Sequence, residues 1–135
     1  VVGIPKLYWF GKDNDYSALV IDVLGPSLGD LLKFCDGKFS LKTVLMIADE
    51  VLQRLEAVHS KGLVYRDVKP NNFLIGMGAK TDKIYMIDFE LAERYLDLDQ
   101  NHHVLGPDQS KGYSCSEFLS IHGHLKIKQS RRDDL

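Results

Sequence analysis

Apolar residues recur three and four positions apart across residues 41–60, which is the spacing of one face of a helix. Ser40 precedes this run as a favourable N-cap residue, and Gly62 follows it as a residue that commonly ends helices. The pattern therefore predicts a helix from residue 41 to about residue 60. Its apolar face is formed by Leu41, Val44, Leu45, Ala48, Val51, Leu52, Leu55 and Val58.

Before this helix the pattern changes to short runs of residues that favour β-structure. Residues 7–10 form an aromatic run that predicts a strand, and residues 11–15 predict the turn after it. Residues 16–24 are rich in apolar and β-branched residues and predict a strand that is buried on both faces. Ser27 then predicts the N-cap of a short helix, and Asp30 is favourable in its first turn.

After the long helix the sequence predicts more strands and then a loop. Residues 63–64 predict a short strand. Residues 73–75 and 84–87 predict a hairpin, because a connection rich in glycine and lysine separates the two apolar runs. From residue 91 to about 120 the chain is polar and irregular, which predicts a long surface loop.

Composition and charge narrow the class of protein. The chain has 135 residues, at most one domain, with a formal net charge of −2. The small charge excludes a global pull toward nucleic acid or an acidic membrane, and no apolar run approaches the roughly 20 residues of a membrane span. We therefore expect neither partner, and no pattern indicates an oligomeric state.

Two further features concern the cell compartment and the chain start. Cys35 and Cys115 have no metal-ligand spacing, and as reduced thiols they indicate a cytoplasmic or nuclear protein. The chain begins Val1-Val2, without an initiator methionine or a basic leader segment. No signal peptide is visible, and we expect a fragment or a trimmed start.

The most specific motif is Tyr-Arg-Asp-Val-Lys-Pro-Asn-Asn at 65–72, with Asp-Phe-Glu at 88–90 after the predicted hairpin. This joint pattern resembles the phosphoryl-transfer site of a protein kinase. The alternative interpretation is a turn that is rich in polar residues and has no function. Such a turn would not require all these positions to match the kinase pattern at the same time. The hairpin leaves the motif at Asn72 and returns at Asp88, so it brings together two side chains with the oxygen atoms that magnesium prefers. The Lys-Pro pair at 69–70 favours a serine/threonine protein kinase over a small-molecule phosphotransferase.

With these motifs in place, the whole chain resembles the casein kinase I family of serine/threonine kinases. Four stretches carry this resemblance beyond the general motifs, and residues 105–117 match least. They are Leu-Gly-Pro-Ser-Leu at 24–28, Phe-Ser-Leu-Lys-Thr-Val-Leu at 39–45, Val-His-Ser-Lys at 58–61 and Gln-Ser-Arg-Arg-Asp-Asp-Leu at 129–135.

The resemblance implies an α+β, protein kinase-like fold that is partial. Residues 1–24 would be a remnant of the small lobe. Residues 25–135 would be the large-lobe portion, reaching from the hinge through the first half of that helical lobe. Within this portion the resemblance implies a catalytic loop at 65–72 and an activation segment at 88–120. It also implies ATP and Mg²⁺ as cofactors and protein serine or threonine hydroxyls as substrates.

The resemblance also assigns roles to single residues. Asp67 matches the catalytic base and Lys69 the lysine that contacts the transferring phosphate, while Asn72 and Asp88 match the magnesium ligands. Asp134 matches the residue that holds the backbone of the catalytic loop. Five residues are implied around the nucleotide base: the hinge residues Val23, Leu24 and Gly25, whose backbone would bind adenine, and the apolar Leu74 and Ile87. Leu74 and Ile87 would be core residues in any fold, so their role rests on the resemblance alone.

Several departures from the family pattern bear on activity. The chain contains no Gly-x-Gly-x-x-Gly loop and no Val-Ala-x-Lys strand, the parts that cover and clamp the phosphates, and it stops at Leu135. Glu90 stands where the family has glycine after Asp-Phe. Glu117 stands in place of an arginine that reads acidic or phosphorylated substrates, and Cys115 in place of a threonine that contacts substrate.

Two functions follow from these observations. In the first, the chain is the middle of a casein kinase I-like enzyme that phosphorylates protein serine or threonine, with turnover by the isolated chain impaired or lost. In the second, it is a catalytically dead, pseudokinase-like binding module or a non-functional gene fragment. The intact Asp67, Lys69, Asn72 and Asp88 support the first, and Glu90 and Glu117 support the second.

Overall fold

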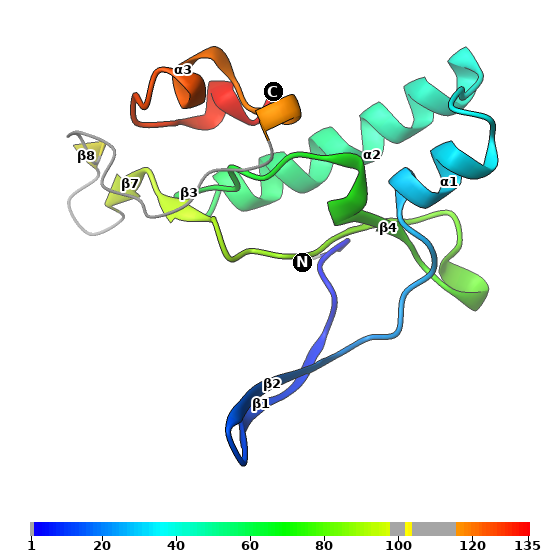
Figure 1. Cartoon of the computed structure of the whole chain (residues 1–135), viewed down its shortest axis with the longest axis horizontal. Helices are drawn as coiled ribbons and strands as arrows, with labels where there is room; N and C mark the ends of the chain where they lie inside the picture. The colour runs from blue at the N-terminus through cyan, green and yellow to red at the C-terminus, as the bar shows by residue number, and fades with distance from the viewer. Residues whose placement is uncertain (1, 98–101, 104–115) are drawn as a thin grey trace.

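The computed structural model of the chain describes residues 2–97, 102–103 and 116–135. Helices and antiparallel strand pairs occur together, which confirms the α+β class. In Figure 1 two helices lie above a strand-rich middle, and an N-terminal hairpin extends away from both. None of the described helices is long and apolar enough to cross a membrane.

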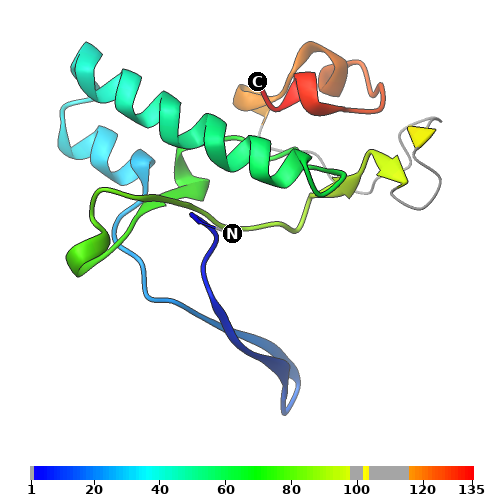
Figure 2. The same cartoon turned by 180° about the vertical axis from the view of Figure 1, so that it is seen from behind.

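The N-terminal hairpin consists of β1 (Leu7–Asp13) and β2 (Tyr16–Ile21), which pair antiparallel. Figure 2 shows it as an arm that points away from the helices. The strand continues to Asp13, so the predicted turn at 11–15 is wrong except at its last two residues. The prediction that residues 16–24 are buried on both faces is also wrong, because no other described segment covers this two-stranded arm and most of its side chains are exposed.

Helix α1 (Leu28–Phe34) begins where the sequence predicts. The backbone N–H of Asp30 donates to Ser27 Oγ at 3.1 Å, and the N–H of Ser27 donates to Asp30 Oδ2 at 3.2 Å. Together these two hydrogen bonds form a capping box, which satisfies donors that the first turn of a helix leaves unpaired. Leu28 at the start of the helix is buried in the core.

Helix α2 (Leu41–His59) is the longest element and confirms the predicted helix, although it ends one residue earlier. Ser40 Oγ accepts the N–H of Thr43 at 3.1 Å. Gly62, at φ 74°, lies just beyond the end in a conformation that favours glycine. Only the C-terminal part of the apolar face is fully buried, at Leu55 and Val58. Leu41, Val44, Leu45 and Leu52 are exposed.

The strands after α2 form two small pairs. β4 (Phe73–Ile75) and β5 (Ile84–Met86) confirm the predicted hairpin, in a register that places Phe73 opposite Met86. β3 (Leu63–Val64) pairs with β6 (Glu93–Arg94). The core residues pack between the two helices and the β4–β5 hairpin; they are Leu28, Leu55, Val58, Tyr65, Phe73, Ile84 and Met86.

The segment predicted as an irregular loop at 91–120 contains more structure than expected. Besides β6 it includes β7 (Leu96–Asp97), β8 (His102–His103) and the 3-10 turn at Ser116–Phe118. Residues 98–101 and 104–115 of this segment lie outside the described residues. Helix α3 (Ile121–His124) and a 3-10 turn at Arg131–Asp133 complete the chain and lie side by side in both views of the molecule (Figures 1 and 2).

Candidate active site

The predicted catalytic loop joins β3 to β4 and ends in a 3-10 turn at Pro70–Asn72. Asp67 is buried, and its Oδ2 accepts hydrogen bonds from Lys69 Nζ at 2.7 Å and from Asn72 Nδ2 at 2.6 Å. Asn72 Nδ2 also donates to the carbonyl of Asp67 at 3.0 Å. The 3-10 turn brings Asn72 back toward Asp67, so two of the residues predicted for catalysis and metal binding, Lys69 and Asn72, both contact Asp67.

Asp134 holds the start of this loop. Its Oδ2 accepts the backbone N–H of Tyr65 at 2.8 Å, and its Oδ1 accepts the N–H of Arg66 at 2.7 Å. His59 Nε2 lies 2.7 Å from the same Oδ2. Arg66 has φ 70°, a left-handed conformation that costs free energy for a residue with a side chain. By accepting these two N–H groups, Asp134 fixes the backbone just before this strained residue, which is the contact the family resemblance implies for Asp134.

Tyr65 connects the loop to the segment that carries Asp88. Its hydroxyl donates to the carbonyl of Ile87 at 2.5 Å, and its ring meets the Phe89 ring edge to face, 5.3 Å between centroids. Burial raises the pKa of the Tyr65 hydroxyl, and the negative charges of Asp67, Asp88 and Asp134 raise it further despite an opposing hydrogen bond with Asn72. Tyr65 therefore stays protonated and keeps its hydrogen bond to the residue before Asp88.

A backbone hydrogen bond at the end of the hairpin places Asp88 next to the catalytic loop. The N–H of Ile87 donates to the carbonyl of Asn72 at 3.0 Å, so Asp88 follows directly beside Asn72. Asp88 is exposed and has φ 59°, whereas Asn72 is buried. Glu90 is exposed, and its backbone N–H lies 3.4 Å from Asp88 Oδ1. The spacing predicted from the sequence thus brings the two oxygen-bearing side chains to neighbouring positions.

The donor set is chemically suited to magnesium. The Asn72 amide uses its nitrogen for both hydrogen bonds to Asp67, so the amide oxygen is the atom that can face a cation. Mg²⁺ commonly takes one or two protein oxygens and completes its shell with water and phosphate oxygens. Across the described part of the chain, no group of three or more His, Cys, Asp or Glu side chains could hold a metal ion. A Mg²⁺ ion held by Asn72 and Asp88 would complete its shell with water and with phosphate oxygens of a ligand.

The predicted hinge borders a small hollow of about 130 Å³, which Val23, Leu24 and Tyr85 help to line. The N–H of Gly25 donates to the carbonyl of Ile75 at 2.8 Å, so this donor is already used within the chain. The prediction that hinge backbone groups bind adenine therefore concerns Val23, Leu24 and the Gly25 carbonyl. Two further predicted residues, Leu74 and Ile87, are half-buried and are not among the lining residues of this hollow.

Sequence analysis missed three side chains that contact the loop or the Asp134 carboxylate that holds it. They are His59 on Asp134, and Glu93 and Gln129 on Arg66. Each lies far along the chain from its partner, and no local pattern indicates such a contact. Of the family departures, Glu117 is exposed, and Cys115 lies outside the described residues.

Comparison with known families identifies a domain that spans most of the chain. A family model described as the protein kinase domain matches residues 3–129. The match covers most of the chain and includes each of the residues predicted for catalysis, metal binding and nucleotide binding. It confirms a protein kinase-like fold.

Proposed function

The chain belongs to the protein kinase domain family, and from this premise we propose that it is part of a casein kinase I-like serine/threonine kinase. Its reaction would transfer a phosphoryl group from ATP to a serine or threonine hydroxyl of a protein. The observation that carries this proposal is the contact of Lys69 and Asn72 with the Asp67 carboxylate, beside Asp88. We also propose a cytoplasmic or nuclear location, with residues 1–24 in the small lobe and residues 25–135 in the large lobe.

Each residue of the site has a distinct part in this proposal. Asp67 accepts the proton of the substrate hydroxyl and orients that hydroxyl for attack. Lys69 brings a positive charge to within 2.7 Å of the same carboxylate, where charge on the transferring phosphate needs stabilisation. Asn72 and Asp88 would hold Mg²⁺. When bound, magnesium-ATP supplies the phosphoryl group and neutralises part of its charge.

Two features favour a second function, a binding module with little or no turnover. Glu90 is exposed two residues after Asp88, at the position where the family has glycine. Its carboxylate adds negative charge where phosphates would bind. The chain also contains no glycine-rich loop, so we expect phosphoryl transfer by these 135 residues alone to be slow.

Thermal unfolding of the chain with magnesium-ATP, with ATP plus EDTA, and without ligand tests the proposal. A ligand that binds only the folded state raises the unfolding temperature. We expect a rise with magnesium-ATP alone, and we expect Asp88→Asn to abolish it. Asp82→Asn is the matched control, because it makes the same change at an exposed carboxylate outside the site.

Two results would count against kinase-type nucleotide binding. One is an unfolding temperature that does not respond to nucleotide. The other is an equal response in the Asp88→Asn variant, which would place binding elsewhere. If Glu90→Gly creates the response that the natural chain lacks, the binding-module function is supported instead.

A further inference from the structure

Arg66, the residue before Asp67, connects the catalytic loop to the C-terminal segment. Its side chain is buried, and its Nη1 donates to Glu93 Oε2 at 3.0 Å. Its Nε donates to Gln129 Oε1 at 3.2 Å. A buried guanidinium needs such partners, and a left-handed residue needs surroundings that hold it there. The contacts of Arg66 therefore bear directly on the placement of Asp67.

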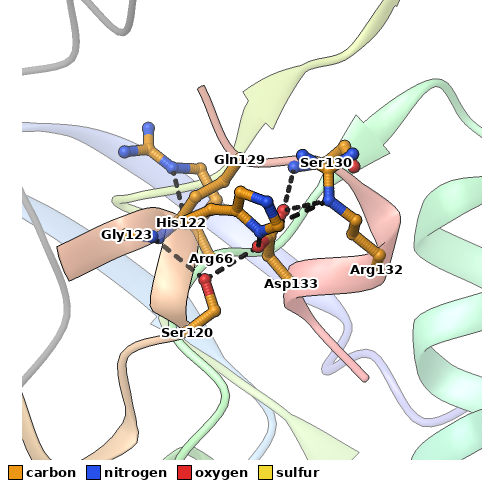
Figure 3. A network of polar contacts seen from close by, with 8 residues as sticks. All are labelled: Arg66, Ser120, His122, Gly123, Gln129, Ser130, Arg132 and Asp133. Atoms are coloured by element: carbon orange, nitrogen blue, oxygen red, sulfur yellow. Dashed lines mark hydrogen bonds and ion pairs between the residues drawn. The ribbon is translucent and has the colours of Figure 1, made fainter. Parts of the chain in front are cut away.

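Gln129 lies between Arg66 and helix α3 (Figure 3). It is 6% exposed, so its carboxamide is enclosed by protein. Its oxygen faces Arg66, while its nitrogen packs so closely against Gly123 of α3 that a Cβ added at Gly123 would collide with it. Gln129 thus contacts both α3 and Arg66, so a change in the position of α3 would change the surroundings of the Arg66 side chain.

The segment around Gln129 is held together by Asp133. Ser120 Oγ donates to Asp133 Oδ1 at 2.8 Å, and His122 Nδ1 lies 3.0 Å from the same atom. The N–H of Ser130 donates to Asp133 Oδ2 at 2.8 Å. Because these bonds join α3 to the 3-10 turn at Arg131–Asp133, the two short elements form one unit (Figure 3).

We propose that Gln129 is a positioning residue for Asp67. Its carboxamide joins Arg66 to α3, so the unit that follows the predicted activation segment sets the orientation of the catalytic loop. Asp134 fixes the loop backbone, whereas Gln129 fixes the side chain of the strained Arg66. The inference rests on the proposed function only in that it takes Asp67 as the catalytic base.

Backbone hydrogen exchange in the 135-residue chain tests this inference. Gln129→Leu introduces an apolar side chain of similar size and removes the acceptor for Arg66 Nε. We expect it to speed exchange at the Tyr65 and Arg66 amides about tenfold, the size expected for one hydrogen bond to a charged group. Exchange in the β4–β5 hairpin should not change, whereas general destabilisation would speed exchange at both places.

Three companion variants make the result specific. Gln129→Glu keeps an oxygen for Arg66 and should restore protection at Tyr65 and Arg66. Gly123→Ala should reproduce the effect of Gln129→Leu from the other side of the contact, and it decides the question if Gln129→Leu does not fold. His124→Ala, an exposed position on α3, is the control and should leave exchange unchanged. Equal speeding in the Glu and Leu variants, or no change in the Leu and Gly123→Ala variants, would overturn the inference.

The inference and the proposed function can fail separately. If the chain shows no magnesium-dependent response to ATP, the proposed function fails, while the exchange comparison still decides whether Gln129 positions the loop. If phosphoryl transfer is measurable, Gln129→Leu should lower kcat and leave KM for ATP unchanged. A change in KM for ATP alone would contradict a role in positioning Asp67.

Discussion

Two adjacent carboxylates near the C-terminus have different structural roles. Asp134 accepts two backbone N–H groups of the catalytic loop, whereas Asp133 accepts bonds from the segment that contains α3. Both side chains are almost fully buried, with 1% and 2% of their surfaces exposed. A buried carboxylate is costly unless hydrogen bonds satisfy it. Each therefore ties a distant segment of the chain to this region.

The pKa of Asp133 makes its contribution to stability depend on pH. Burial alone would raise this pKa, but hydrogen bonds from the Ser130 N–H and the Ser120 hydroxyl, together with Arg132 and His122, hold it below the usual 3.8. A carboxyl group with a lower pKa in the folded state stabilises the fold above its unfolded pKa. That stabilisation is lost as the pH falls through the folded value. We expect the free energy of unfolding to decrease below about pH 4.

Replacing Asp133 separates its contribution to the pH dependence of stability from that of other carboxylates. The Asp133→Asn variant should lose stability at neutral pH and show a shallower decline in acid, as measured by urea unfolding between pH 2 and 7. Asp22 and Asp30 also have lowered pKa values, so some acid dependence should persist in the variant. Asp82→Asn serves as the exposed control. If the free energy of unfolding decreases with falling pH equally steeply in the variant and in the natural chain, Asp133 does not contribute to this pH dependence.

At the level of elements, helices α1 and α2 begin at local capping signals. Ser27 caps α1 and Ser40 caps α2, and each serine oxygen accepts an N–H three residues later. Such caps stabilise a helix by roughly 1 kcal/mol because they pair N–H groups that the first turn cannot bond. The Ser27 cap is buried and also precedes Leu28, a core residue, so it affects packing as well as the helix.

Ser27→Ala is therefore expected to lower the free energy of unfolding by about 1–2 kcal/mol. The loss should appear as a lower urea midpoint with an unchanged slope, because the surface exposed on unfolding stays the same. Ser17→Ala, an exposed serine on β2, is the matched control and should change little. If both variants unfold at the same urea concentration as the natural chain, the cap does not stabilise α1 in this way.

Which elements could be predicted depends on how local their signals are. The caps, the helical spacing of α2 and the β4–β5 hairpin are encoded within short stretches, and the structure confirms them. The β3–β6 pair and the exposure of β2 depend on which distant segments are nearby, and the sequence pattern does not contain this information. For the same reason the short motif that contains Asp67, Lys69 and Asn72 could be recognised in the sequence, whereas the contact of Arg66 with the distant Gln129 could not.

At the level of the whole molecule, the core occupies only part of the structure. Figure 1 shows the β1–β2 arm extending from the helices and the N-terminal half of α2 reaching beyond the strands. Both regions expose large apolar side chains. Monomeric soluble proteins rarely expose extended apolar patches, because contact between such patches removes apolar surface from water. We therefore expect the chain on its own to associate as its concentration rises.

The cross-strand pair Phe10 and Leu19 allows this expectation to be tested without loss of folding. The two side chains are 68% and 60% exposed, so replacing both by threonine removes apolar surface but little core packing. Threonine pairs are also favourable across antiparallel strands. Sedimentation velocity over a range of concentrations should show less association for this double variant, with an unchanged urea midpoint.

Replacing Leu41 and Leu45 of α2 by glutamine is the matched comparison, since they are 73% and 61% exposed. If only the α2 variant reduces association, the helix face mediates it; if neither variant does, exposed apolar surface at these two regions is not its cause.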